Sequence, residues 1–215
     1  MKRLGRTFFS CDAAVLAPAL LGCTFVRMTD AGERLAGLIV ETEAYAGPAD
    51  QAAHTRNGHR SPRNEVMWGD AGLCYVYFTY GMHHCMNVVC GGVDVPEAVL
   101  VRAIEPVDGI EIMRTNRSST ATGSKPRKHP LRDRDLCSGP ARLCQALGIS
   151  RDENGLDMTQ SDRLWIEPAP DIGRGAVPPD RIVNTTRVGI DSAGPEWAGK
   201  PWRWYDRGSA HVSKR

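Results

Sequence analysis

Pairs of short strand-like runs, each pair separated by a turn, constrain the fold of this chain more than any other feature. Residues 23–28 are followed by residues 35–45 after a Thr-Asp-Ala-Gly-Glu turn, and residues 73–78 are followed by residues 85–90 after the connection 79–84. Aliphatic, β-branched and aromatic runs separated by turn residues are typical of β-hairpins. Consecutive hairpins predict an antiparallel sheet.

The rest of the chain combines helices with further strands. Helical patterns cover residues 12–21, 107–115 and 139–147, and strands are expected near residues 98–104, 181–190 and 202–205. This mixture predicts an α+β fold around an antiparallel sheet with peripheral helices. We expect a single domain over residues 1–215, although two smaller domains also fit this length.

Two long segments do not fit a helix or a strand pattern. Residues 47–72 are rich in Gly, Pro, Asn, His and Arg, and irregular loops of this length inside a compact domain are usually functional. Residues 116–135 are polar and dense in Arg and Lys. The second segment is therefore predicted to be a mobile basic loop.

Composition excludes several classes of protein. The hydrophobic share of 41% and the charged share of 24% are those of a globular protein. The longest apolar run, residues 13–22, contains Pro18 and is shorter than the about 20 residues that a bilayer span needs. No obvious signal-peptide cleavage site follows it. We expect a soluble, intracellular protein without a membrane segment, and no long N-terminal extension before Leu4.

Charge and cysteine content are less specific. The net charge is +2, and only five of the 27 basic residues are lysines. The arginine excess suits contacts to phosphates, but GC-biased codon use accounts for the same excess and is the preferred explanation, so composition alone does not indicate nucleic-acid binding. The seven cysteines contain no Cys-x-x-Cys pair, and several lie in apolar runs. They are expected to be buried thiols in a reducing compartment.

Two carboxylates and a phenol share one face of a predicted strand. In residues 39–45, strand alternation places Glu41, Glu43 and Tyr45 on the same side. This face could be solvated, or it could hold and polarise a water molecule for hydrolysis. Alternation does not choose between the two glutamates.

A second cluster, residues 53–64, contains Arg56, Arg60 and Arg63 together with two histidines. Such a segment suits a nucleic-acid phosphate backbone, and a solvated loop is the alternative. In the second hairpin, Tyr75 and Tyr77 share a face, where core packing is the ordinary interpretation. Tyr80 lies in the turn, and a protruding aromatic residue there suits a wedge inserted into DNA.

Other chemistries lack their motifs. Neither a zinc-deaminase string, a phosphate-binding Gly-rich loop nor a dinucleotide fingerprint occurs. His83 and His84 precede Cys85, but adjacent side chains on a strand point to opposite faces, so no metal site is predicted. Each lysine lies in a terminal or polar segment, which disfavours Schiff-base chemistry. No metal and no cofactor is therefore expected.

Several strings, in order along nearly the whole chain, resemble the alkyladenine (3-methyladenine, or N-methylpurine) DNA glycosylase family. They are Ile-Val-Glu-Thr-Glu-Ala-Tyr at 39–45, Asp-Gln-Ala-Ala-His at 50–54, Pro-Arg-Asn at 62–64, Tyr-Val-Tyr-Phe-Thr-Tyr-Gly-Met at 75–82, Cys-Met-Asn at 85–87, Leu-Val-Arg-Ala-Ile-Glu-Pro at 100–106, Leu-Cys-Ser-Gly-Pro at 136–140 and Arg-Val-Gly at 187–189. The resemblance implies a single mixed domain on a curved antiparallel sheet, with a protruding hairpin that enters the DNA minor groove.

The resemblance also implies roles for individual residues. Glu43 is the general base, Arg102 helps to hold the attacking water, and the main-chain carbonyl of Val188 contacts it as well. The pocket that sandwiches the flipped base is formed by Tyr45, His54 and Tyr77. Asn87 discriminates against the 2-amino group of normal guanine.

At the hairpin tip, Tyr80 fills the gap that the flipped base leaves, with Met82 beside it; His83 stands where the family is expected to have an aromatic residue. The implied partner is double-stranded DNA that contains 3-methyladenine, 7-methylguanine, hypoxanthine or ethenoadenine. The protein is expected to be a monomer. It is also expected to lack lyase activity, because no lysine is available to attack the sugar. The alternatives are a catalytically silent lesion-binding protein on the same scaffold and a hydrolase of free nucleosides.

Overall fold

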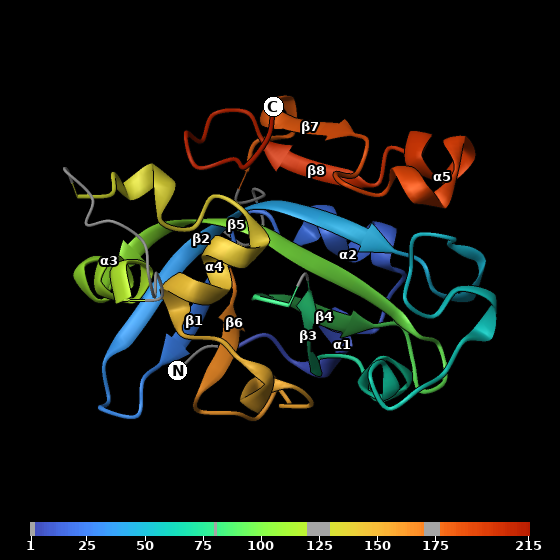
Figure 1. The fold of residues 1–215 in the computed structure, drawn as a ribbon, viewed down its shortest axis with the longest axis horizontal. Coiled ribbons are helices and arrows are strands. Elements are labelled where there is room, and N and C mark those ends of the chain that lie inside the picture. Colours follow the sequence, from blue (N-terminus) through green and yellow to red (C-terminus); the bar gives the residue numbers. More distant parts are fainter. Residues whose placement is uncertain (1–2, 80, 120–129, 170–176) are drawn as a thin grey trace.

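The computed structural model describes residues 3–79, 81–119, 130–169 and 177–215, and an eight-stranded antiparallel sheet is their framework (Figure 1). The strands are β1 (Thr24–Met28), β2 (Arg34–Tyr45), β3 (Cys74–Thr79), β4 (His83–Cys90), β5 (Glu97–Asp108), β6 (Leu164–Glu167), β7 (Ile182–Thr185) and β8 (Arg203–Asp206). The helices are α1 (Arg6–Phe9), α2 (Ala13–Ala19), α3 (Ile110–Ser119), α4 (Pro140–Leu147) and α5 (Pro195–Gly199). The predicted α+β class is confirmed.

The two longest strands, β2 and β5, run side by side through the middle of the curved sheet (Figure 1). The strand order is β3-β4-β5-β2-β1-β6, and β8 pairs with both β2 and β7. Pairing between β2 and β5 shifts register on both sides of Glu41, and Arg102 is the residue of β5 that is left without a partner at one of these bulges. Bulges are frequent beside functional sites because they redirect a side chain.

Both faces of β2 are covered. The hydroxyl of Thr42 donates to the carbonyl of Ala17 in α2 at 2.8 Å, and Thr42 has no exposed surface. Glu41 and Glu43, on the other face, are also fully buried. A solvated face for these carboxylates, one of the two alternatives from the sequence, is therefore wrong.

One large apolar cluster joins α2, α4 and alternate residues of the strands. Among its members are Leu16 of α2, Leu143 of α4 and Val101 of β5, none of which has exposed surface. Because this apolar set occupies every second position, the intervening residues of β3, β4 and β5 are free to line a different space.

Some element boundaries differ from the prediction. Strand β5 extends to Asp108, which pairs with Ala36 of β2, so the helix predicted from residue 107 begins only at Ile110. Helix α1 and strand β6 were not predicted. Pairing with β1 holds β6 in the sheet, a contact across about 140 residues of chain that a local pattern does not reveal.

The expected mobile basic loop, residues 116–135, is only partly a loop. Helix α3 continues to Ser119, a 3-10 helix covers Asp133–Asp135, and Arg117 donates to the carbonyl of Leu136 at 2.7 Å. Residues 120–129 lie outside the described residues. The two ends of this segment are therefore held against the body of the protein.

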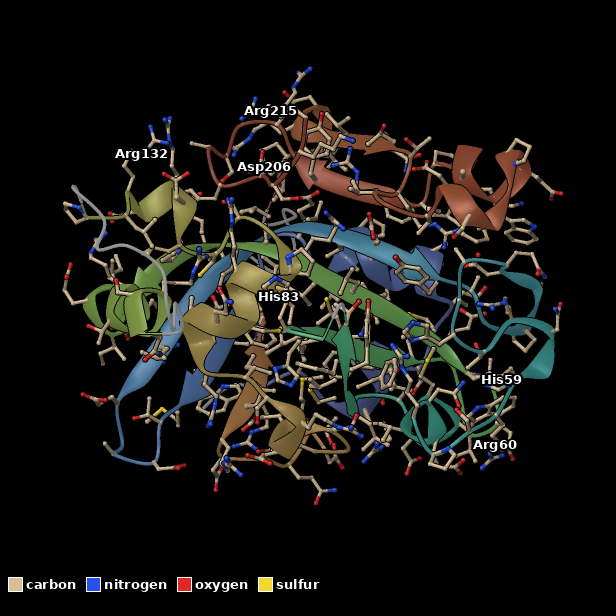
Figure 2. All side chains as sticks on the ribbon, viewed as in Figure 1. His59, Arg60, His83, Arg132, Asp206 and Arg215 are labelled. Atoms are coloured by element: carbon tan, nitrogen blue, oxygen red, sulfur yellow. The ribbon has the colours of Figure 1, made fainter. Side chains whose placement is uncertain are left out.

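The segment between β2 and β3 is compact. It contains three 3-10 helices, η1 (Gly47–Ala49), η2 (Arg56–Gly58) and η3 (Glu65–Trp68). Buried Asn64 organises it, because its Nδ2 donates to the carbonyls of His54 and His59, both at 2.9 Å, while its Oδ1 accepts from the N–H of Ser61 at 2.8 Å. Figure 2 shows His59 and Arg60 at the outer edge of this segment.

Within the described stretches, no helix has both the length and the apolar character that a membrane crossing requires. All seven cysteines are free thiols, six of them buried and Cys11 half-buried.

Candidate active site

A cavity of about 340 Å³ opens on the face of the sheet opposite the main apolar cluster. Its floor consists of alternate residues of adjacent strands: Tyr75, Tyr77 and Thr79 of β3, Cys85 and Asn87 of β4, Ala98, Leu100 and Arg102 of β5, and Tyr45 of β2. The segment after β2, the loop after β7 and Pro140 complete the wall. The volume is in the range of small-molecule sites, about 300–1,000 Å³.

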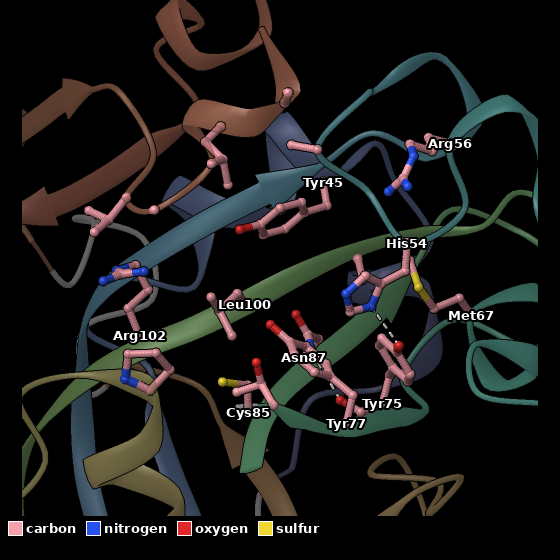
Figure 3. A pocket seen from close by; sticks show the side chains of 18 of the residues that line it. Tyr45, His54, Arg56, Met67, Tyr75, Tyr77, Cys85, Asn87, Leu100 and Arg102 are labelled. Carbon is pink, nitrogen blue, oxygen red and sulfur yellow. Dashed lines mark hydrogen bonds between the residues drawn. The ribbon is translucent and has the colours of Figure 1, made fainter. Parts of the chain in front are cut away.

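Aromatic rings stand on two sides of this cavity. Tyr45 projects from the end of β2, and His54 and Tyr77 face it across the open space (Figure 3). The ring centroids of His54 and Tyr77 are 4.5 Å apart in an edge-to-face contact. Tyr75 fixes the histidine, because its hydroxyl lies 2.7 Å from Nδ1 of His54. These rings form two aromatic walls of the cavity.

The aromatic groups are held in their neutral forms. Burial, and then the positive charges of Arg63 and Arg56, lower the pKa of His54 from 6.5 to about 4. Burial raises the pKa of Tyr75 to about 12, with Arg63 opposing it. Burial and the neighbouring Glu43 raise the pKa of Tyr45 well above its ordinary value. At neutral pH the cavity therefore presents an uncharged imidazole and protonated phenols.

Glu43 lies directly behind the cavity wall. Its Oε1 accepts from the backbone N–H of Val188 at 2.7 Å and forms an ion pair with Arg102 at 3.2 Å, and its Oε2 accepts from the hydroxyl of Tyr45 at 3.0 Å. All three partners line the cavity. An ionised carboxylate beside a cavity, held by several donors, is suited to accept a proton or to stabilise positive charge.

Glu41 is placed differently. Its Oε1 accepts from Arg102 Nε at 3.0 Å and from Arg203 at 2.9 Å, and its Oε2 accepts from the N–H of Ser213 at 2.6 Å. Of these partners of Glu41, only Arg102 lines the cavity. The structure thus separates the two glutamates that alternation left equivalent: Glu41 supports Arg102, and Glu43 lies next to the cavity.

Arg102 connects both carboxylates to the cavity. Its burial lowers the guanidinium pKa, but the adjacent Glu43 and Glu41 outweigh this effect and raise the pKa overall. A further N–H donates to the hydroxyl of Ser213 at 3.2 Å, in the C-terminal segment. The guanidinium is therefore a fixed positive charge with its position determined by β2 and the C-terminal segment.

Asn87 lies on the cavity floor, 3% exposed. Its Nδ2 donates to the carbonyl of Tyr75, its cross-strand neighbour, at 3.1 Å. This bond fixes the orientation of the amide beneath the two tyrosines of β3.

Comparison with known proteins agrees with this geometry. The family model described as "Methylpurine-DNA glycosylase (MPG)" matches residues 7–210. The chain belongs to this family. It is accordingly a DNA glycosylase, an enzyme of base excision repair, as the sequence resemblance implied.

Relatives in this family come from mammals and bacteria. The "DNA-3-methyladenine glycosylase" of Homo sapiens is 46% identical over 99% of this chain and 68% of its own length, and that of Mus musculus is 46% identical over 98% of the chain and 61% of its own length. The "Putative 3-methyladenine DNA glycosylase" of Bacillus thuringiensis (strain Al Hakam) is 42% identical over 97% of this chain and 98% of its own length. The chain thus spans about two thirds of the mammalian relatives and nearly all of the bacterial one.

The structure brings together the residues expected at the family's pocket and catalytic centre. Tyr45, His54, Tyr77, Asn87, Arg102 and Val188 line one cavity, and Glu43 lies behind it. The carbonyl of Val188 was expected to contact water; its N–H in addition holds Glu43. The roles of these residues remain predictions.

The residues expected to contact DNA are more dispersed. Arg56 lines both the cavity and a neighbouring hollow of about 550 Å³, and Arg63 lines that hollow. Arg60 pairs with Glu65 at 2.5 Å and with Asp94 at 3.2 Å, so two carboxylates already neutralise it.

The hairpin of β3 and β4 carries exposed apolar side chains near its tip. Met82 is 66% exposed and Phe78 is 42% exposed, and the N–H of Met82 closes the turn by donating to the carbonyl of Thr79. Tyr80, the expected wedge, lies outside the described residues. His83 belongs to β4 and pairs with Thr79, so the turn is shorter than the six-residue connection expected.

Three residues of this site had no predicted role: Asp50, Arg187 and Ser213. Asp50 and Arg187 form a buried ion pair across 137 residues of chain, and Ser213 reaches Glu41 across 172 residues. Single polar residues this far apart leave no periodic signal. In the described part of the chain, no group of His, Cys, Asp and Glu side chains is arranged to hold a metal ion.

Proposed function

We propose that this enzyme removes damaged purines from double-stranded DNA by hydrolysing the N-glycosidic bond of a base that has rotated out of the helix. The observation that carries the proposal is the placement of Glu43. Three groups that line an aromatic cavity hold its carboxylate directly behind the wall. The sugar of a base stacked in that cavity would lie near this carboxylate.

Stacking favours the rotated state. Extruding a nucleotide costs a few kcal/mol, least for a damaged or weakly paired base. Stacking on aromatic side chains returns about 1–3 kcal/mol per base. Tyr45 on one side, with His54 and Tyr77 on the other, provides two such surfaces. Since every purine has a π-face, this pocket accepts several lesions.

Hydrolysis requires a water molecule and stabilisation of charge on the sugar. As the base departs, the sugar gains oxocarbenium character, which the anionic Glu43 stabilises while it accepts the proton of the attacking water. Arg102 and the carbonyl of Val188 orient this water. The protonated hydroxyl of Tyr45 supports the same carboxylate through its hydrogen bond.

The substrates proposed are 3-methyladenine, 7-methylguanine, hypoxanthine and ethenoadenine. In DNA, 3-methyladenine and 7-methylguanine carry a positive charge and leave as neutral bases, and the neutral imidazole of His54 avoids repelling them. Neutral hypoxanthine and ethenoadenine must in addition receive a proton or a hydrogen bond as they leave. The amide of Asn87, fixed on the cavity floor by its bond to Tyr75, would disfavour the 2-amino group of normal guanine. 7-Methylguanine carries the same group, but its positive charge makes the base leave more easily.

We propose that the hairpin of β3 and β4 enters the minor groove. The exposed Met82 and the neighbouring Tyr80 would occupy the space that the base leaves, as apolar wedges do in other DNA-bending proteins. Arg56, Arg63 and, more weakly, the paired Arg60 would contact phosphates. A catalytically silent lesion-binding protein would share these contacts.

Residues 1–215 are proposed to form one domain that acts as a monomer inside the cell, in the nucleoid of a bacterium or the nucleus of a eukaryote. The product would be an abasic site on an intact strand, since no lysine is found among the described residues that line the cavity. Light scattering on the purified protein would test the monomer.

Base release from a panel of lesion duplexes, with enzyme in excess and a chelator present, tests the proposed function. We expect release of hypoxanthine or 3-methyladenine and no strand cleavage. Lesion binding without release would support the silent binding protein. Equal release from free nucleosides and from duplexes would support the nucleoside hydrolase.

A further inference from the structure

A completely buried ion pair lies behind Tyr45 and has no place in the mechanism above. Arg187, in the loop after β7, and Asp50, after η1, have no exposed side-chain surface. The guanidinium contacts the carboxylate through two nitrogens, at 2.5 and 2.9 Å. Neither residue lines the cavity. The pair therefore acts on the site only through its neighbours.

The first neighbour is the stacking ring. The guanidinium carbon of Arg187 lies 4.9 Å from the ring centroid of Tyr45 and 5.0 Å from that of Trp202, and one N–H donates to the carbonyl of Ala44 at 3.0 Å. Because Arg187 lies over the ring of Tyr45 and does not line the cavity, we infer that it covers the face of Tyr45 that is turned away from the cavity. The other face is left for a ligand.

The second neighbour is the donor that holds Glu43. Val188 follows Arg187 directly, and its N–H donates to Oε1 of Glu43 at 2.7 Å. A shift of the Arg187 backbone would therefore move the donor and the carboxylate that it fixes. Arg187 thus contacts the stacking ring through its guanidinium and is linked to Glu43 through the peptide group that follows it.

The third connection runs through Asp50. Its carboxylate accepts from the N–H of Ala46 at 3.2 Å and from the N–H of Ala52 at 3.0 Å. Ala52 lines the cavity, and the same segment carries His54, on the opposite wall. Asp50 thereby fixes the start of the segment whose aromatic residue faces Tyr45.

One donor of this guanidinium is left without an acceptor in the described part of the chain. Among the described residues, the buried Nε–H of Arg187 has no acceptor, and an unsatisfied buried donor is unfavourable. The guanidinium instead contacts the rings of Tyr45 and Trp202 and the carboxylate of Asp50. A planar guanidinium can stack on a ring and at the same time bind a carboxylate through two N–H groups, whereas an ammonium group is a point charge without this fixed fork.

We propose that Arg187, locked by Asp50, is a positioning residue that sets both the stacking ring of Tyr45 and the Val188 N–H that orients Glu43. This inference rests on the proposed function of the cavity. It goes beyond that function in coupling base stacking and water activation to one buried cation. Loss of the guanidinium is expected to impair both together.

The test compares three variants with the wild type. Arg187→Lys keeps the charge without the planar fork. The double variant Arg187→Met with Asp50→Asn removes both charges, so that no unpaired carboxylate is left buried. Arg27→Met is the matched control, because Arg27 forms a similarly buried pair with Glu153 at 3.1 Å and does not line the cavity.

Three readouts separate positioning from folding. Hydrogen exchange at the Val188 amide, measured by NMR on the free protein, reports the bond to Glu43. The fluorescence of an ethenoadenine duplex reports stacking of the rotated base. Single-turnover release at saturating enzyme, measured beside lesion-duplex affinity, separates chemistry from binding. Thermal unfolding gives the stability of each variant.

We expect both Arg187 variants to accelerate hydrogen exchange at the Val188 amide by about tenfold or more and to alter the ethenoadenine fluorescence. They should also slow base release more than Arg27→Met does, even where Arg27→Met is equally or less stable. The inference is overturned if both variants match Arg27→Met in all three readouts. A wild type that binds but releases no base would refute the proposed hydrolysis; Val188 exchange and fluorescence would still decide on Arg187.

Discussion

The lowered pKa of His54 makes a quantitative prediction about the pH dependence of stability. The imidazole titrates at about 4 in the folded protein, owing to burial and to Arg63 and Arg56, and at about 6.5 when unfolded. Between these two values the unfolded chain binds more protons than the folded one. Unfolding is therefore increasingly favoured as the pH falls through this window, and His54 does not lower the free energy of unfolding in this way above pH 7.

Linkage gives the size of the effect. With these two pKa values, the wild type should lose up to roughly 2.5 kcal/mol of unfolding free energy between pH 7.5 and pH 4.5 because of this one group. A variant His54→Gln cannot take up the proton. Its stability is lower at pH 7.5, since the bond to the hydroxyl of Tyr75 changes, but the difference from the wild type should shrink as the pH falls.

Urea unfolding of both proteins at pH 7.5, 6.5, 5.5 and 4.5 measures this difference, and other titrating groups cancel on subtraction. A difference that stays constant over the whole range would refute the neutral, buried imidazole. A difference that grows towards low pH would mean that protonation stabilises the fold, contrary to the contacts described.

Three further predictions concern DNA. Asn87→Ser should increase excision of normal guanine relative to hypoxanthine, and an unchanged product spectrum in a release assay would contradict the role of the amide. Arg63→Gln should reduce the slope of log DNA affinity against log salt concentration by about one phosphate contact. Arg60→Gln should change this slope less, because Glu65 and Asp94 already pair with that cation. Equal slopes for the two variants would refute the distinction. Tyr80→Ala should weaken lesion capture more than it slows single-turnover release, and equal preference for lesion and undamaged duplexes in both proteins would exclude the wedge.

Local pattern was sufficient to predict most strands of the sheet and part of the site. Alternation placed Tyr75 and Tyr77 on one face of β3, and their centroids are 5.6 Å apart. The turn at residues 29–33 forms as expected, and both hairpins are present, the second with a shorter connection than expected. These features depend on neighbours within about ten residues, which is the range over which periodicity carries information.

Long-range contacts determined what the pattern left open. Glu41 and Glu43 are indistinguishable by alternation, but Arg203 of β8 and the C-terminal segment satisfy the first, and Val188 reaches the second across 145 residues. The helix expected from residue 107 starts later because β2 extends the pairing of β5. Such choices depend on which distant segment packs nearby, and no local signal records that.

Single-turnover release from a hypoxanthine duplex, with Glu43→Gln measured beside Glu41→Gln, tests the central claim most directly. Both substitutions neutralise a buried carboxylate on the same face of β2, so general destabilisation is matched. We expect Glu43→Gln to bind the lesion duplex and release base several orders of magnitude more slowly. Glu41→Gln weakens only the support of Arg102, so it should lose far less of its rate once corrected for the folded fraction. Full activity of folded Glu43→Gln would contradict the account.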